Sequence, residues 1–109
     1  MEFQDYWRNQ HGPLIQKFAK TYNVRRYVQS HTLDTALNHG VRKSRGISQE
    51  YDGVAELWWE SEEDFVAAIS SPEGQELRTV FLDDEAKFID FGRSAAFFTS
   101  EHVLVDDER

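Results

Sequence analysis

The sequence contains no cysteine, and long apolar runs are also absent. The lack of cysteine excludes a disulfide framework and a thiolate nucleophile, and it fits a reducing compartment. No apolar run approaches the roughly 20 residues that a membrane-spanning helix needs, and the first residues do not have the pattern of a signal peptide. We therefore expect a cytoplasmic protein with no membrane association.

Motifs for cofactors are missing as well. There are only six glycines, and none belongs to a glycine-rich phosphate loop, a flavin motif or a dinucleotide fingerprint. Gly40 and Gly46 lie near basic residues but lack the required context of strand, loop and helix. The histidines show neither the i, i+4 spacing nor the tight pairing of a preformed metal site. The sequence thus predicts no metal and no organic cofactor.

Charge is unevenly distributed along the chain. The net charge of −8 argues against nucleic acid as a partner, because such binding depends on neutralising phosphates. Residues 1–49 nevertheless carry +5, whereas residues 50–109 carry −13. The basic cluster Arg42, Lys43 and Arg45 fits best as part of a solvated loop. An anionic substrate, or the acidic half of a second subunit, remains an alternative partner for it.

The chain has the size and composition of one folded domain. Its 109 residues suffice for one modest core, so we treat residues 1–109 as a single domain. A hydrophobic fraction of 39% and an aromatic fraction of 14% indicate a folded protein despite 29% charged residues.

A helix is predicted over residues 2–22, with a histidine on its apolar face. Apolar residues recur there at helical spacing, and His11 shares their face. They are Phe3, Trp7, Leu14 and Phe18. Pro13 removes a backbone donor and disfavours helical angles at Gly12, so we expect a kink just after His11 that aims its imidazole inward. Such a histidine is a candidate acid or base, although it could equally bond a backbone carbonyl to secure the kink.

Two strands are predicted, at 24–33 and 53–60, from their β-branched and aromatic residues. Alternation places three side chains of the first strand on one face: Tyr27, Gln29 and His31. In the second strand, Val54, Glu56 and Trp58 should face a cavity, and the alternate set should lie under the helices. We expect His11 to meet Tyr27, Gln29, His31, Glu56 and Trp58 in one constellation. Within it, Glu56 needs a partner or a raised pKa.

The remaining elements follow from local signals. Residues 34–52 form a long polar connection that we expect to be a flexible flap, with room for a helical turn near Ala36. Ser61 and Ser71 should each begin a helix, the second with proline at its first position. The residues predicted to face inward from these helices are Phe65, Ala68, Ile69, Leu77, Val80 and Phe81. A last strand is predicted over 95–105, and 106–109 should be a frayed tail.

Three stretches carry a resemblance to a known family. They are Phe3-x-x-Tyr6-Trp7-x-x-x-His11-Gly12-Pro13-Leu14, Tyr51-Asp52-Gly53-Val54-Ala55-Glu56-Leu57-Trp58 and Phe97-Phe98-Thr99-Ser100-Glu101-His102-Val103. Over nearly the whole chain, they resemble the EthD family. The resemblance implies an α+β fold: a ferredoxin-like antiparallel sheet with helices on one face, which pairs into a dimeric α+β barrel. Relatives open with an apolar strand between the third and last strands, whereas this sequence begins within the helix.

The resemblance constrains the fold better than the reaction. Our first functional hypothesis is a cofactor-independent enzyme that acts by proton transfer on a small cyclic or aromatic carbonyl compound, as a homodimer. Its predicted catalytic residues are His11, Tyr27, His31 and Glu56. Its predicted substrate-binding residues are Gln29, Trp58, Trp7 and Arg42. The alternative is a non-catalytic accessory or ligand-binding protein that supports an oxygenase.

Overall fold

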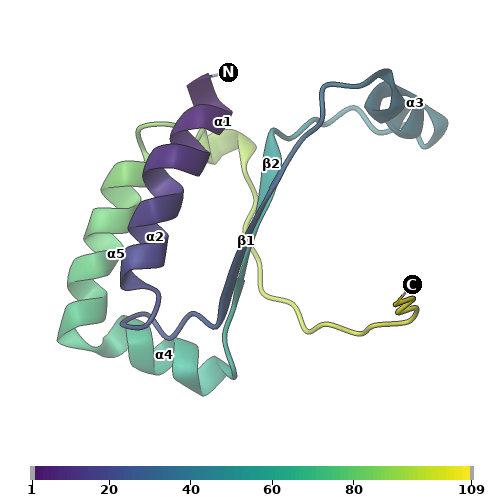
Figure 1. Ribbon diagram of the computed structural model, residues 1–109. Helices are drawn as coiled ribbons and strands as arrows, with labels where there is room; N and C mark the ends of the chain where they lie inside the picture. The colour runs from purple at the N-terminus through teal and green to yellow at the C-terminus, as the bar shows by residue number, and fades with distance from the viewer. Residues whose placement is uncertain (1, 109) are drawn as a thin grey trace.

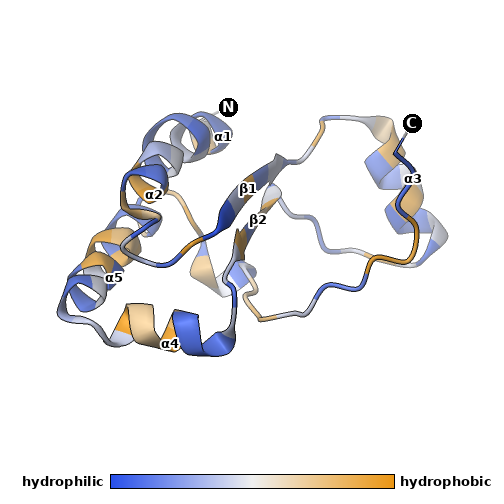
Figure 2. Cartoon of the chain, turned by 60° about the horizontal axis from the view of Figure 1, so that its bottom comes forward, coloured by the Kyte–Doolittle hydropathy of each residue, from blue (hydrophilic) through white to orange (hydrophobic). Residues whose placement is uncertain are grey.

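The computed structural model describes residues 2–108 of an α+β protein (Figure 1). In chain order the elements are α1 (Glu2–Tyr6), a π-helical turn (Trp7–His11), α2 (Gly12–Phe18), β1 (Arg26–His31), α3 (Ala36–Ser44), β2 (Gly53–Trp58), α4 (Glu62–Ser70), α5 (Pro72–Glu85) and a 3-10 turn (Phe91–Arg93). The helices α1, α2 and α5 lie on one side of the two strands, and α3 lies on the other (Figures 1 and 2).

The first helix passes through Pro13 without breaking. Gly12 keeps helical angles, with φ −55° and ψ −53°, so the expectation that proline would push it out of the helical region is wrong. The Gly12 N–H donates to the carbonyl of Trp7, five residues back, which makes the preceding turn π-helical. The extra residue in this turn changes the position of the preceding carbonyl groups relative to the Pro13 ring. A π-helical bulge is therefore present where the sequence predicted that the helix would break.

The strands β1 and β2 confirm two of the predicted strands and form an antiparallel pair. Tyr27 is opposite Leu57 and Val28 is opposite Glu56. Because directly paired residues share a face, Tyr27 and Leu57 lie on the helix-covered face and Glu56 lies on the outer face. The face of β1 that carries Tyr27 therefore looks toward the helices, not away from them as predicted.

The core lies between α2, α5 and the covered face of the sheet. Its buried residues Ile15, Leu77 and Phe81 are packed against a ring of partly buried side chains. These are Leu14, Phe18, Tyr22, Tyr27 and Leu57. Val80 was predicted to face inward but is exposed, because the buried stripe of α5 runs along Leu77 and Phe81, four residues apart.

Both predicted serine caps are present. The Ser61 hydroxyl accepts a hydrogen bond from the Asp64 N–H at 3.1 Å, and the Ser71 hydroxyl accepts one from the Gly74 N–H at 2.9 Å. Pro72 occupies the first turn of α5, where its missing N–H would have no helical partner. These local signals fix where α4 and α5 begin.

The connection between the strands contains more structure than expected. Nine of its residues form α3, whose first turn is capped by the side chain of Thr35. The sequence predicted a flap with at most a helical turn, because most residues of this segment are polar. The helical spacing of Leu37 and Val41 was not recognised as the mark of a longer helix. No residue of α3 is buried.

The predicted last strand is not formed. Residues 95–105 do not pair with β1 or β2. The ring of Phe98 lies 4.9 Å from that of Phe65, but Phe98 is still 72% exposed. In the predicted layout the last strand pairs with a strand that precedes the first helix. The described residues contain no such strand, so this segment has no backbone partner. Residues 106–108 are irregular, and Arg109 of the predicted tail lies outside the described residues.

Candidate functional site

A buried histidine and an aspartate form a close polar contact between the first helix and α5. His11 is 5% exposed, and its Nδ1 lies 2.8 Å from Oδ2 of Asp84, at the end of α5. The Tyr6 hydroxyl donates to the other oxygen, Oδ1. Burial raises the pKa of Asp84, but the hydrogen bonds from Tyr6 and His11 outweigh it, so the net pKa is lowered. Asp84 is therefore ionised at neutral pH and orients the imidazole with Nδ1 as the donor.

A second carboxylate lies near the other ring nitrogen. Oε2 of Glu85 is 4.0 Å from Nε2 of His11, which is too long for a hydrogen bond. Burial raises the pKa of Glu85; the His11 charge lowers it and the Asp84 charge raises it. The ring of Phe88 lies 5.1 Å from that of His11. The imidazole is thus held at Nδ1, whereas no hydrogen bond within residues 2–108 uses the lone pair of Nε2.

Neither acid was predicted as a site residue. Asp84 is 73 residues from His11 in the sequence, and the acidic run 83–85 looks like a solvated helix end. The one signal in the sequence is that the aromatic residue Phe88 closely follows the acidic run. An aromatic residue at this place indicates that the end of α5 packs against other residues. It could not indicate which histidine the acids would meet.

A second polar network crosses the covered face of β1. The amide nitrogen of Gln29 donates to the carbonyl of Trp7 and to the Tyr27 hydroxyl, at 2.8 Å each. The amide oxygen then accepts from Nε2 of His31, also at 2.8 Å, which assigns the ring proton to that nitrogen. The indole of Trp7 stacks on His31, with ring centroids 4.4 Å apart.

Tyr27 is prepared to act as a hydrogen-bond donor. Burial raises its pKa, with smaller lowering contributions from Gln29 and Trp7. The phenol therefore keeps its proton at neutral pH. Its oxygen accepts from Gln29, and its O–H donates to no acceptor among residues 2–108, so this proton can be donated to a ligand.

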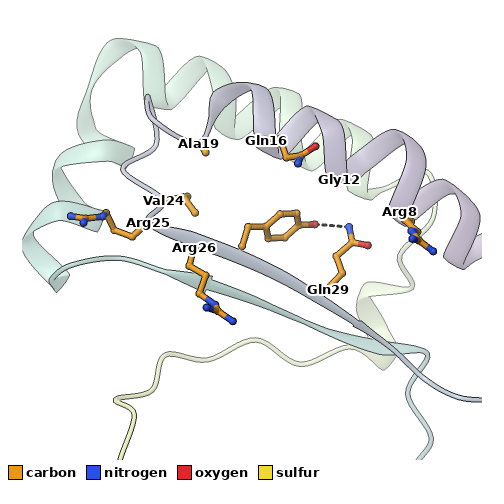
Figure 3. A pocket seen from close by; sticks show the side chains of 9 residues that line it. Arg8, Gly12, Gln16, Ala19, Val24, Arg25, Arg26 and Gln29 are labelled. Atoms are coloured by element: carbon orange, nitrogen blue, oxygen red, sulfur yellow. Dashed lines mark hydrogen bonds between the residues drawn. The ribbon is translucent and has the colours of Figure 1, made fainter. Parts of the chain in front are cut away.

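A cavity of about 490 Å³ lies between the first helix and β1 (Figure 3). Its lining residues are Arg8, Gly12, Gln16, Ala19, Val24, Arg25, Arg26, Tyr27 and Gln29. Arg25 and Arg26 point away from its centre, toward the Glu60 carboxylate and the Trp58 ring respectively. A Cβ on Gly12 would lie 3.1 Å from the Gln29 amide nitrogen, so glycine allows the helix to approach this network closely. The volume suits a small ligand.

These elements, from the first helix to the 3-10 turn, coincide with a known domain. The family model described as EthD domain matches residues 1–92. The chain belongs to the EthD family. No curated protein and no solved structure gives a significant match. The EthD match ends before the 97–103 stretch, so it depends on the helical layer and the two strands.

The EthD domain brings some of the predicted site residues together and separates others. Trp7, Tyr27, Gln29 and His31 are in contact with one another, and His11 lies on the same side of the sheet. Three predicted site residues lie elsewhere, and two of them, Glu56 and Trp58, were expected in the constellation around His11, which is corrected accordingly. They are Glu56, exposed on the outer face of β2; Trp58, on the same face; and Arg42, paired with Glu50 at 2.8 Å in the α3 segment.

The described part of the EthD domain contains no group of three or more residues arranged to hold a metal ion. Among residues 2–108, no helix combines the length and apolar character needed to cross a membrane.

We expect Glu85→Gln to stabilise the protein at pH 7. A raised pKa means that the folded state binds a proton more tightly than the unfolded state, so stability is lost as pH rises from the unfolded pKa through the folded pKa. Glutamine removes the cost of an ionised, partly buried side chain. The melting temperature should rise by a few degrees at pH 7, and the gain should vanish below the unfolded pKa. Thermal melts of both proteins from pH 3 to pH 8 measure this difference; a gain that grows toward low pH would contradict it.

Proposed function

We propose that this EthD-domain protein is a cofactor-independent enzyme that moves a proton on a small cyclic or aromatic carbonyl compound. The observation that carries the proposal is the contact between His11 and Asp84, which leaves Nε2 free beside the half-buried Glu85. The absence of cysteine supports a reducing, cytoplasmic setting for this enzyme.

In the proposed reaction His11 is the general base. Neutral imidazole takes a proton on Nε2 from a carbon next to the carbonyl, and Asp84 stabilises the resulting imidazolium. The Tyr27 O–H donates to the oxygen on which negative charge develops, while Gln29 fixes the phenol. Return of the proton to another atom completes an isomerisation. From the same enolate, attack on a second carbonyl of the substrate gives cyclisation, loss of a β-hydroxyl as water gives dehydration, and reaction with dioxygen as the oxidant gives oxygenation.

The outer face of the sheet supports a homodimer as part of the proposal. Val54 is exposed there, and Glu56 and Trp58 share its face. Nothing in the described part of the chain covers this face in the way that α2 and α5 cover the other. Packing of two outer faces about a two-fold axis would bury it and form the dimeric α+β barrel.

A second candidate is a non-catalytic ligand-binding or accessory protein that supports an oxygenase. It is favoured by the burial of His11, which is 5% exposed and does not line the cavity. In this case the contact with Asp84 is a structural link between the first helix and α5, and a ligand bound in the cavity leaves unchanged.

Exchange of substrate protons with D₂O distinguishes the two candidates. Proton NMR on a panel of cyclic and aromatic ketones and lactones should show catalysed loss of a signal next to a carbonyl. Asp84→Asn, which removes the charge that stabilises the imidazolium, should slow this loss by about 10²-fold or more. Binding of a panel compound without exchange above the buffer rate would favour the accessory protein and contradict the enzyme.

A further inference from the structure

The helix α3 carries an apolar stripe that its own chain does not cover. Leu37 and Val41 lie four residues apart on one face and are 75% and 56% exposed. Figures 1 and 2 both show α3 on the opposite side of the strands from α1, α2 and α5. Two large apolar side chains on an outlying helix need a partner surface.

Unpaired positive charge accompanies this stripe. Arg42 is bound to Glu50, but among residues 2–108 neither Lys43 nor Arg45 contacts a carboxylate. No acidic residue occurs between positions 35 and 49. In a chain with a net charge of −8, α3 is a local basic and apolar surface.

The outer face of α4 has the complementary character. A shallow hollow of about 540 Å³ is lined by Glu62, Glu63, Val66, Ala67 and Ser70. Val66, one of these lining residues, is 53% exposed, and in the described part of the chain no cation pairs with either glutamate. An apolar residue bordered by two carboxylates matches the end of α3, where Arg45 follows Val41 by four residues on the same side of the helix.

The helix α3 cannot reach this hollow within its own chain. It joins the end of β1 to the start of β2, whereas α4 follows the other end of β2. Six strand residues span roughly 20 Å, and Figure 1 shows the two helices at opposite ends of the strands. A two-fold axis that lies between the outer sheet faces and runs perpendicular to the strands reverses the strand direction of the second copy, and it brings the α4 of that copy to the end where α3 stands.

We propose that α3 docks on the outer face of α4 in a second copy of this chain, with Leu37 and Val41 over Val66 and with Arg45 beside Glu62 and Glu63, while Lys43 adds to the positive charge at the same end of α3. This docking rests on the face-to-face pairing in the proposed function. In this arrangement, the contact of α3 with α4 of the partner stabilises the dimer in addition to the packing of the two sheets.

Charge reversal with rescue tests the docking. Sedimentation equilibrium at low salt should show that Lys43→Glu with Arg45→Glu weakens the dimer about tenfold or more. Glu62→Lys with Glu63→Lys should weaken it similarly, because each pair of changes sets like charges against each other. Combining all four changes should restore the dissociation constant to within about threefold of wild type, and the separate losses should shrink in 1 M salt.

Two further variants serve as controls. Lys17→Glu with Lys20→Glu makes the same change in net charge at the end of α2 and in the turn that follows it, and it should leave the dimer unchanged. Val41→Ser alters no charge and should weaken the dimer through lost apolar contact. Melting temperatures of all variants confirm that they fold.

The outcomes separate this docking from the proposed chemistry. Reversals that act no more strongly than the α2 control, or a quadruple variant without recovery, would overturn the docking alone. A wild type that stays monomeric at 100 μM, a value on the order of a weak dimer's dissociation constant, would overturn both pairing and docking. Neither result affects the D₂O exchange experiment, which tests the proposed reaction independently of the dimer.

Discussion

Replacing His11 with asparagine is expected to lower turnover by about 10²–10⁴-fold and to leave the fold intact. The side-chain amide of the introduced asparagine can still donate to Asp84 from a position close to that of Nδ1, so the link between the first helix and α5 is kept. It offers no nitrogen lone pair in place of Nε2, and the proton would have no acceptor. The comparison therefore removes the chemistry of the ring while preserving its structural contact.

The measurement is the rate of D₂O exchange on a ketone or lactone that the wild type processes, together with a thermal melt. His102→Asn is the matched control, since it is the same substitution in the exposed C-terminal segment and should change neither value. A His11→Asn protein that melts normally and exchanges at the wild-type rate would show that the imidazole is structural. A large drop in melting temperature would call for the milder His11→Gln variant before rates are compared.

The parts of this protein that were predicted correctly depend on neighbours in the sequence. The strands 26–31 and 53–58 follow from their β-branched and aromatic residues, and the starts of α4 and α5 follow from serine caps that bond N–H groups three residues ahead. Burial of His11 also followed from periodicity, because the spacing from Trp7 is that of one helical face. Each of these signals is local.

The parts that failed depend on distant partners. Both faces of β1 mix polar and apolar residues, so alternation could group Tyr27 with Gln29 but could not say that this face meets the helices. The register with β2 decides that point and sends Glu56 to the other side. His11 and Asp84 are in contact although they are 73 residues apart in the sequence, and no local sequence pattern predicts such a contact. The last strand failed for the same reason, because a strand exists only where a neighbour pairs with its backbone.

Gly74→Ala is expected to cost about 3 kcal/mol of unfolding free energy, the upper end of the usual range for an overpacked core. A Cβ at this position would lie 1.7 Å from the carbonyl oxygen of Ala68, an atom of the α4 backbone. That oxygen also accepts the Ser71 hydroxyl at 2.9 Å, so it cannot move without disturbing the cap of α5. Relief of the clash requires α4 and α5 to separate, and the packing of buried Ala68 is lost with it.

Gly40→Ala provides the contrast, because nothing lies within 4 Å of a Cβ there. In the interior of α3, alanine should stabilise by roughly 0.5–1 kcal/mol through helix propensity alone. Urea unfolding of the two variants beside wild type measures the opposite signs. If Gly74→Ala unfolded at or above the wild-type urea concentration, α4 and α5 would not meet as closely as described. The close packing of α4 against α5 would then not be what positions α5, and with it Asp84, beside His11. The substitution thus tests the helix packing that supports the candidate site without changing any polar group of the site.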